Sequence, residues 1–370
     1  MGLHPRTMPG PAALRLAIFV FALVADTSAV AELPKFMVEA TVKGRYVEGG
    51  PLAWSDERVI LLARDGQIWD FSPVDAQDYR KTASYFAPYS SREMQERLEA
   101  EFGRTMDVTS TGHYLVVHPA GQVQMWADRF EQMYGEFVHN FGVRGISTNQ
   151  PDLPLVAIVF TRRDDFVRYS LGEGYRFVGD VLGYYSPKSN RVSILDATSL
   201  AGAGLDWRQN AATVIHETAH QVAFNTGVHN RFVVTPRWLA EGLGTMFEAR
   251  GVWDPQEYPN ERDRINRGRF ADFRNHAASR HMAGTVQELV ASDKPFERDA
   301  IAAYAEAWAL TFYLAERQPR EYAEYLRKTA ARPNFVPYTA PQRIADFTSI
   351  FGDGWRMLDA RVARFMGELR

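Results

Sequence analysis

Two histidines and a glutamate stand at a spacing suited to metal chemistry, in the segment His216-Glu217-Thr218-Ala219-His220. Residues four apart on an α-helix project from one face on successive turns, so both imidazoles can bind the same ion. Glu217 follows the first imidazole by one position, from which its carboxylate can reach a water beside the ion and act as a general base. The pattern predicts a hydrolytic metal site on one helix.

A histidine pair on a buried helix can also be a hydrogen-bonded part of the core, and this pattern arises by chance in about one such chain in a hundred. A catalytic zinc site usually has a third protein ligand. Glu241 is the candidate, within Trp238-Leu239-Ala240-Glu241-Gly242-Leu243-Gly244. A carboxylate in such an apolar stretch needs a partner, which a metal ion would provide. The alternative is a surface glutamate on a helix packed through its apolar neighbours.

Composition restricts the chemistry of this site. The 370 residues include no cysteine, which excludes disulfides, thiolate nucleophiles and zinc sites built on cysteine. Any metal site must therefore use histidines and carboxylates. Lys+Arg 42 against Asp+Glu 45 gives a formal charge of -3, so the basic footprint of a nucleic-acid binder is missing. The sequence does not determine an oligomeric state.

The N-terminus has the pattern of a secretory signal peptide over residues 1–31. Arg6 and Arg15 precede an apolar run from Leu16 to Ala25, and Ala29-Val30-Ala31 provides the small residues of a cleavage site. The run is about half of the ~20 residues that a bilayer span requires, so a retained membrane anchor is the weaker alternative. We expect an exported protein, periplasmic or secreted, with no membrane span after cleavage.

The elements that must position the site predict an α+β fold. We expect a small β-rich module over residues 32–85, in which Gly49-Gly50-Pro51 marks a turn between two strands. Residues 86–370 should form the larger domain, α+β to about residue 205 and helical from 206. Its expected elements are a helix over 91–102, strands at 106–109 and 113–118, a helix over 123–141, a strand at 155–160, a helix from 164, and a hairpin of 181–185 and 191–195.

Two helices should carry the site residues. Asp206 is the expected N-cap of the first helix and Gly227 its C-cap. Thr235-Pro236 should begin the second, with a capping hydroxyl and a proline at the first helical position, and Gly251 should end it.

Glycines in the second helix carry a further prediction. Gly242 and Gly244 each cost up to about 1 kcal/mol in a helix interior, and small residues let two helix backbones approach closely. We therefore expect tight helix packing at this point.

Together these motifs resemble the signature of gluzincins, zinc metallopeptidases whose third ligand is a glutamate on a downstream helix, and in particular a bacterial branch with a WLxEGL helix. A metzincin would need glycine at 223 and histidine at 226, where this chain has Ala223 and Thr226. The resemblance is strongest over about residues 150–320. It implies a gluzincin-like domain, with a mixed sheet and an active-site helix followed by a mostly helical part.

The resemblance also implies a zinc-dependent peptidase acting on peptides or proteins. His216, His220 and Glu241 would bind one Zn²⁺, and Glu217 would polarise the attacking water and pass its proton to the leaving amine. Aminopeptidases of this group recognise the substrate amine with a Gly-x-Met-Glu-Asn segment, which is missing from residues 183–196. This favours an endopeptidase. The alternative is a noncatalytic zinc-containing module of the cell envelope that binds through the same scaffold.

Gluzincins share two further structural features, and this sequence has a candidate for each. Arg191–Leu195 is the candidate for an edge strand that pairs with an extended substrate, although it can also be an ordinary hairpin strand. Tyr304, 63 positions after Glu241, is the candidate for stabilising the oxyanion, with a packed tyrosine as the alternative and His281 as a weaker candidate. Thr245 and Glu248 are possible outer groups that orient the ligands.

Overall fold

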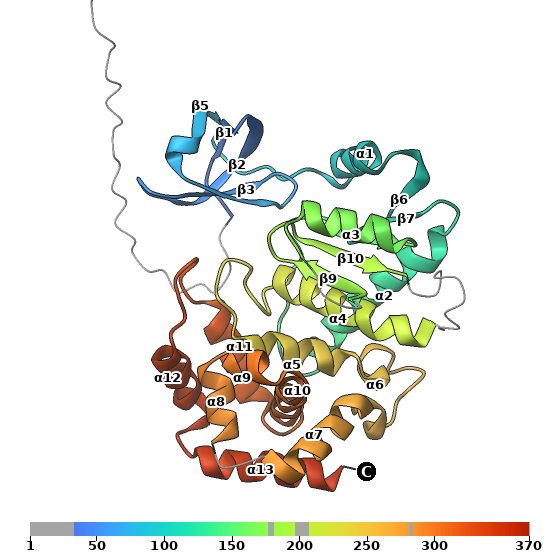
Figure 1. The fold of residues 1–370 in the computed structure, drawn as a ribbon, viewed down its shortest axis with the longest axis vertical. Coiled ribbons are helices and arrows are strands. Elements are labelled where there is room, and N and C mark those ends of the chain that lie inside the picture. Colours follow the sequence, from blue (N-terminus) through green and yellow to red (C-terminus); the bar gives the residue numbers. More distant parts are fainter. Residues whose placement is uncertain (1–32, 177–180, 197–206, 281–283, 370) are drawn as a thin grey trace, which may run out of the picture.

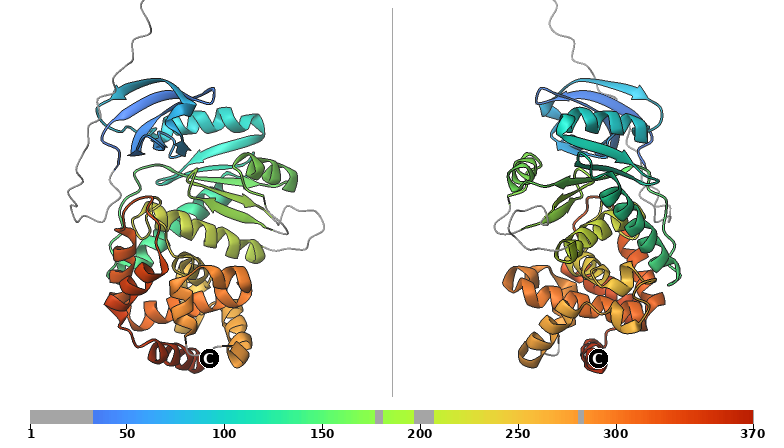
Figure 2. Two further views of the ribbon diagram at one scale, coloured as in Figure 1. Left: turned by 60° about the vertical axis from the view of Figure 1, so that its left-hand side comes forward. Right: turned by 90° about the vertical axis from the view of Figure 1, so that its right-hand side faces the viewer.

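The computed structural model describes residues 33–176, 181–196, 207–280 and 284–369. The expected signal peptide, Asp206 and His281 lie outside these residues. Along the longest axis, a sheet formed by the N-terminal residues, a second sheet with its helices and a helical C-terminal part follow one another (Figures 1 and 2). The protein is therefore a mixed α+β structure with a β-rich N-terminal region and a mostly helical C-terminal part.

The N-terminal sheet is antiparallel and has the strand order β4-β3-β2-β1-β5. Apolar side chains that alternate along β1 and meet residues of β2 and β3 form its core, with Val38, Ala40, Val42, Val47, Val59 and Leu61 buried. Its strands are β1 (Met37–Val42), β2 (Arg45–Trp54), β3 (Val59–Ala63), β4 (Ile68–Phe71) and β5 (Ala76–Ala83).

The turn predicted at Gly49-Gly50-Pro51 is wrong, because these residues lie inside β2. The chain reverses at Lys43 and Gly44 instead, both with positive φ. Gly49 is required by close packing, since a Cβ there would lie 2.4 Å from the Leu62 carbonyl oxygen. Pro51 stands where the register between β2 and β3 shifts, a position at which a sheet tolerates proline.

The second sheet is mixed, with the order β6-β7-β8-β10-β9. Strands β7, β8 and β10 run parallel, while β6 and β9 pair antiparallel with their neighbours. The elements of this part lie within about two residues of the predicted ones. They are α1 (Ser91–Phe102), β6 (Met106–Ser110), β7 (Tyr114–Pro119), α2 (Val123–Gly142), β8 (Leu155–Phe160), α3 (Arg163–Gly172), β9 (Gly183–Ser186) and β10 (Arg191–Leu195).

Of the two alternatives for Arg191–Leu195, the edge strand is wrong and the ordinary hairpin strand is correct. This segment, β10, lies between β8 and β9, and β9 forms the edge. The hairpin itself is confirmed. Both of its strands are almost entirely buried, so the hydrophobic pattern does not reveal which of the two lies at the edge of the sheet.

Helices cover both faces of the second sheet. On one face, Leu115 and Ile158 pack with residues of α1 and α3. On the other, Val116 and Ala157 belong to a large core shared with α2 and the first helix of the C-terminal part, α4 (Trp207–Asn225). The alternation of side chains along the strands thus divides the apolar residues between two cores.

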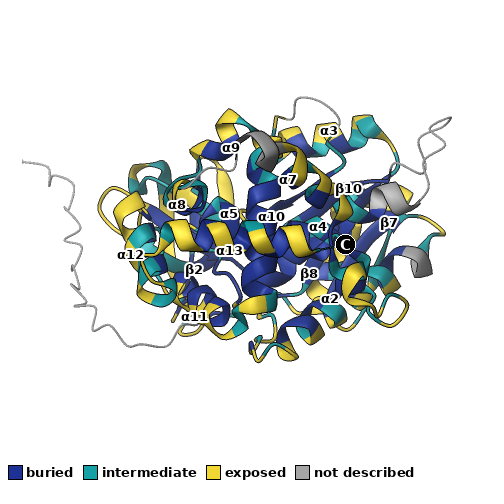
Figure 3. Ribbon diagram, turned by 90° about the horizontal axis from the view of Figure 1, so that it is seen from below, coloured by how far each residue is buried: buried dark blue, intermediate teal, exposed yellow. Residues whose placement is uncertain are grey.

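The C-terminal part surrounds α10 (Ala300–Arg317), which is buried along most of its length (Figure 3). No helix among the described residues has both the length and the hydropathy needed to cross a membrane. The remaining helices are α5 (Arg237–Phe247), α6 (Arg250–Trp253), α7 (Arg267–Arg280), α8 (Thr285–Ala291), α9 (Lys294–Arg298), α11 (Pro319–Ala330), α12 (Ala340–Phe351) and α13 (Trp355–Glu368).

The predicted ends of the two site helices are only partly correct. Gly227 follows α4 with φ of 82°, as a glycine C-cap requires. However, α5 begins at Arg237 with Pro236 as N-cap and no capping side chain, so Thr235 does not have the predicted capping role. Helix α5 also ends at Phe247. Gly251 lies in α6, where a Cβ would come 2.7 Å from the backbone of Asp263, so packing explains this glycine.

Candidate metal centre

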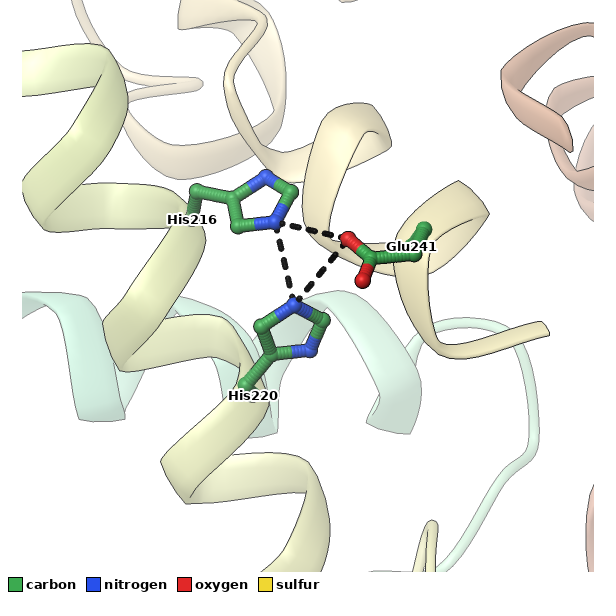
Figure 4. Close-up of side chains that lie close together, drawn as sticks. All are labelled: His216, His220 and Glu241. Carbon is green, nitrogen blue, oxygen red and sulfur yellow. Dashed lines mark hydrogen bonds and ion pairs between the residues drawn. The ribbon is translucent and has the colours of Figure 1, made fainter. Parts of the chain in front are cut away.

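Helices α4 and α5 bring His216, His220 and Glu241 together, as Figure 4 shows. The two imidazole Nε2 atoms lie 3.0 Å apart, and Glu241 Oε2 lies 3.2 Å from that of His216 and 3.6 Å from that of His220. Atoms that bind zinc tetrahedrally at its usual distances are separated by about 3.3 Å. This donor set could therefore hold one metal ion.

Glycines allow the two helices to approach closely enough for this geometry. A Cβ on Gly244 would lie 2.7 Å from the His216 ring. On the other side of α5, a Cβ on Gly242 would lie 2.2 Å from Thr311 Oγ1 and 2.6 Å from the Ala307 carbonyl oxygen of α10. The predicted tight packing is confirmed, and it places α5 between the metal helix and the buried α10.

A chain of hydrogen bonds orients the first ligand. His216 Nδ1 donates to Glu248 Oε1 at 2.9 Å, and Asn266 Nδ2 donates to Glu248 Oε2 at 2.7 Å. A carboxylate on the outer nitrogen fixes the tautomer, which leaves Nε2 directed toward His220 and Glu241. Of the two outer candidates, Thr245 instead donates to carbonyls of its own helix, including that of Glu241. Asn266 follows α5 in a separate segment and had no signal in the sequence.

Hydrogen bonds and opposite charges link His216, His220 and Glu241 when no metal is bound. Burial opposes protonation of His216, but hydrogen bonds with Glu241 and Glu248 outweigh it and raise the pKa of this imidazole well above its usual value. Burial likewise opposes ionisation of Glu241, yet its contacts with both imidazoles hold its pKa well below the ordinary range. The buried carboxylate is thus paired, as expected of a group that cannot stay charged alone.

Glu217 lies against the edge strand of the sheet. Its Oε2 accepts a hydrogen bond of 2.8 Å from the backbone N–H of Tyr185 in β9. Leu182 O accepts a hydrogen bond from Leu195 N–H of β10, and bonded and non-bonded pairs alternate along the ladder. Tyr185, paired with Val192, therefore directs its N–H away from β10. The edge strand therefore holds one oxygen of the carboxylate beside the metal ligands. No side-chain pattern in the sequence indicated this backbone contact.

Tyr304 lies at the same site, on α10. Burial is the largest cause that raises the pKa of its hydroxyl, to about 12, and the negative charge of Glu241 contributes next. Arg237 lies close enough to lower it in part. The ring packs edge-to-face against Phe296 with centroids 5.3 Å apart. The phenol is therefore protonated at neutral pH and stands near the third ligand. The structure thus brings all five predicted residues to one place.

A further histidine, His229, interacts electrostatically with His220 and was not predicted. It is fully buried, and burial together with the charge of His220 lowers its pKa to about 3. Its ring lies 5.2 Å from that of Phe224, between centroids. A neutral imidazole in this position adds no charge to the centre. Its sequence spacing to the metal motif carried no signal, because the chain reaches it through the Gly227 turn.

Comparison with known families gives a match, which covers part of the chain. Residues 210–336 match a family described as "Protein of unknown function (DUF1570)". The matched stretch contains His216, Glu217, His220, Glu241 and Tyr304. No curated protein matches the chain.

Proposed function

We propose that the protein is an exported zinc-dependent peptidase of the gluzincin type. The convergence of His216 Nε2, His220 Nε2 and Glu241 Oε2, with Glu217 on the adjoining turn, is the observation that carries the proposal. The motif resemblance supports the peptidase class. The signal-like residues 1–31 support export.

The protein residues would divide the chemistry as follows. His216, His220 and Glu241 would hold zinc, which supplies a Lewis acid that makes water a better nucleophile near neutral pH. Glu217 would take the proton of the attacking water and give it to the amine nitrogen of the cleaved bond. Tyr185 N–H binds its Oε2, and the other oxygen, which bonds to none of the described residues, would make this transfer. The protonated Tyr304 would donate a hydrogen bond to the carbonyl oxygen as negative charge develops there.

The edge of the sheet supports a peptide as substrate. Strand β9, not β10, ends the sheet beside α4, and of the backbone groups that β10 leaves unused, Tyr185 N–H is bonded to Glu217. An extended peptide would add a strand at this edge, which brings its scissile bond alongside Glu217. An endopeptidase is the preferred form of the activity because the amine-recognition segment of the aminopeptidases is missing.

Metal analysis combined with a Glu217→Gln variant tests the proposal. We expect about one zinc per chain in both proteins, and cleavage of a broad peptide library that falls about 100- to 10,000-fold in the variant. Tyr304→Phe should lower kcat by a smaller factor while zinc content is unchanged. Protein without stoichiometric zinc, or a variant as active as the parent, would disprove the proposal.

A zinc-containing parent that cleaves no peptide would favour the noncatalytic binding module. In that case a hydroxamate separates the two kinds of site. Tight binding to an open metal position raises the melting temperature by mass action, whereas a closed structural site gives no shift.

A further inference from the structure

We propose that Arg237 and Arg269 form a carboxylate-binding subsite beside the metal centre. The preferred substrates would then carry a carboxylate close to the cleaved bond, either an acidic side chain or a free C-terminus. This inference rests on the proposed peptidase function, and it defines the substrate class of the same site.

The two guanidinium groups come from different helices and meet at one aromatic ring. Arg237 lies one turn before Glu241 on α5, with its Nε 3.8 Å from Glu241 Oε1. Its Cζ is 5.9 Å from the centre of the Tyr304 ring, and the Cζ of Arg269, from α7, is 5.2 Å from the same centre. Both cations therefore border Tyr304, the candidate oxyanion donor, and Arg237 also borders Glu241.

Aromatic contacts hold the first cation in place. The Cζ of Arg237 lies 4.6 Å from the centre of the Phe296 ring, which itself packs edge-to-face on Tyr304. Stacking of this kind restricts the guanidinium before a ligand arrives and so reduces the entropy lost on binding. The planar fork of N–H donors then matches the two oxygens of a carboxylate.

Neither arginine is neutralised by a bidentate carboxylate among the described residues. Arg237 has the 3.8 Å contact with Glu241, whose Oε2 faces the two imidazoles, and Arg269 has a contact of 3.3 Å with Asp272. The nearby Asp293 forms its two short side-chain bonds with Arg343 and accepts only the backbone N–H of Arg237.

Both side chains remain within reach of a ligand in solution. Arg237 is 41% exposed and Arg269 is 27% exposed. A structural arginine bridge would bury the head group between fixed acceptors, as Arg343 does with 7% exposure against Asp293. Two partly exposed cations beside the candidate metal centre are instead suited to an anionic group of the substrate.

Matched peptides test the subsite. We would prepare fluorescein-labelled hexapeptides that carry Glu or Gln at each position in turn, every one as the free acid and as the C-terminal amide. Binding is measured by anisotropy on zinc-loaded Glu217→Gln protein and on metal-free parent, and kcat/KM is measured on the zinc-loaded parent. Two peptides that differ only in one carboxylate, as Glu against Gln or as free acid against amide, are the charged and the neutral twin. A charged hydrogen-bonded pair predicts a preference of about tenfold or more for the charged twin.

Variants assign the preference to these two residues. The double variant Arg237→Gln/Arg269→Gln should bind charged and neutral twins alike. Arg237→Lys should keep part of the preference, because it retains the charge and loses the fork. Arg361→Gln/Arg364→Gln, on the exposed face of α13, removes the same charge away from the site and should keep the full preference.

The outcomes separate the sources and the hypotheses. A preference that persists in the amides identifies an acidic side chain, and one that amidation abolishes identifies a free C-terminus. A parent that treats twins alike, a double variant that keeps the preference, or a loss in the α13 control as large as in the double variant would overturn the subsite. Cleavage without preference contradicts the subsite alone, whereas protein without zinc or cleavage contradicts the peptidase and leaves the metal-free binding measurement to decide the subsite.

Discussion

In the N-terminal sheet, Arg58 Nη2 and Asp70 Oδ2 pair at 2.6 Å although their side chains are 53% and 48% exposed. In the metal centre, Glu241 and Glu248 contact His216 with only 18% and 17% of their side chains exposed. An exposed pair competes with water and contributes little, whereas a buried one must be satisfied or it destabilises the fold. The carboxylates beside His216 must therefore be paired for the fold to be stable, whereas the exposed Arg58–Asp70 pair adds little to a sheet held by its apolar core.

Hydrogen bonds of one arginine, Arg231, connect the N-terminal sheet with the second sheet. Arg231 Nη2 donates to the Gly66 carbonyl of the N-terminal region at 2.7 Å and to the Pro187 carbonyl of the β9–β10 turn at 2.8 Å. Burial lowers the pKa of this guanidinium. The sheet is therefore attached to the hairpin that carries the edge strand.

The largest expected effect comes from adding a methyl group to α5 where it packs against α10. Gly242→Ala should destabilise the protein by about 2–3 kcal/mol, because the new Cβ overlaps a backbone carbonyl of α10. Gly135→Ala in α2, where a Cβ meets nothing within 4 Å, should instead stabilise by about 0.5–1 kcal/mol. Urea unfolding of both variants measures the difference. Equal effects at the two sites would show that α5 and α10 do not pack as described.

The second largest effect is expected when the charge of the Glu248 carboxylate is removed, which should weaken metal binding. Glu248→Gln should lower zinc affinity about 10- to 100-fold, because the carboxylate that orients His216 becomes a weaker acceptor. Competition with a chelator gives the affinity. Glu316→Gln, in a pair with Arg144 and Arg264, is a control that should leave zinc affinity unchanged. An unaltered affinity in Glu248→Gln would remove this residue from the site.

A pH dependence of zinc affinity follows from the same contacts. The raised pKa of His216 means that the metal-free protein holds a proton there at neutral pH, and zinc must displace it. Affinity should therefore fall about tenfold per pH unit as pH decreases below that pKa. Calorimetry in buffers of different ionisation enthalpy should detect about one proton released at pH 7. Binding without proton release would contradict the pairing of His216.

The smallest effect is expected in the N-terminal sheet. Asp70→Asn removes the exposed pair with Arg58 and should cost less than about 1 kcal/mol, with zinc affinity unaltered. Thermal unfolding and chelator competition provide the two values. A loss of several kcal/mol would show that the sheet depends on its charges as the metal centre does.

Much of the site was predictable because its key relation is local. The four-residue spacing of His216 and His220 on a helix dictates a shared face, whatever the rest of the chain does. The glycines of α5 likewise predict a close contact with another helix, although the sequence does not identify that helix. Gly49-Gly50-Pro51 was misread as a turn because glycine marks close backbone approach as well as chain reversal. The edge strand was misassigned because both hairpin strands are buried.

The sequence by itself determined the donor types, the absence of cysteine ligands, the metal-helix face and the α+β order of the elements, since each depends on composition or on neighbours along the chain. Only the tertiary structure decided that Glu248 orients His216, that Tyr185 N–H holds Glu217 and that Arg237 and Arg269 meet at Tyr304. These contacts join elements far apart in sequence. Their geometry results from how helices and strands pack, which no local spacing encodes.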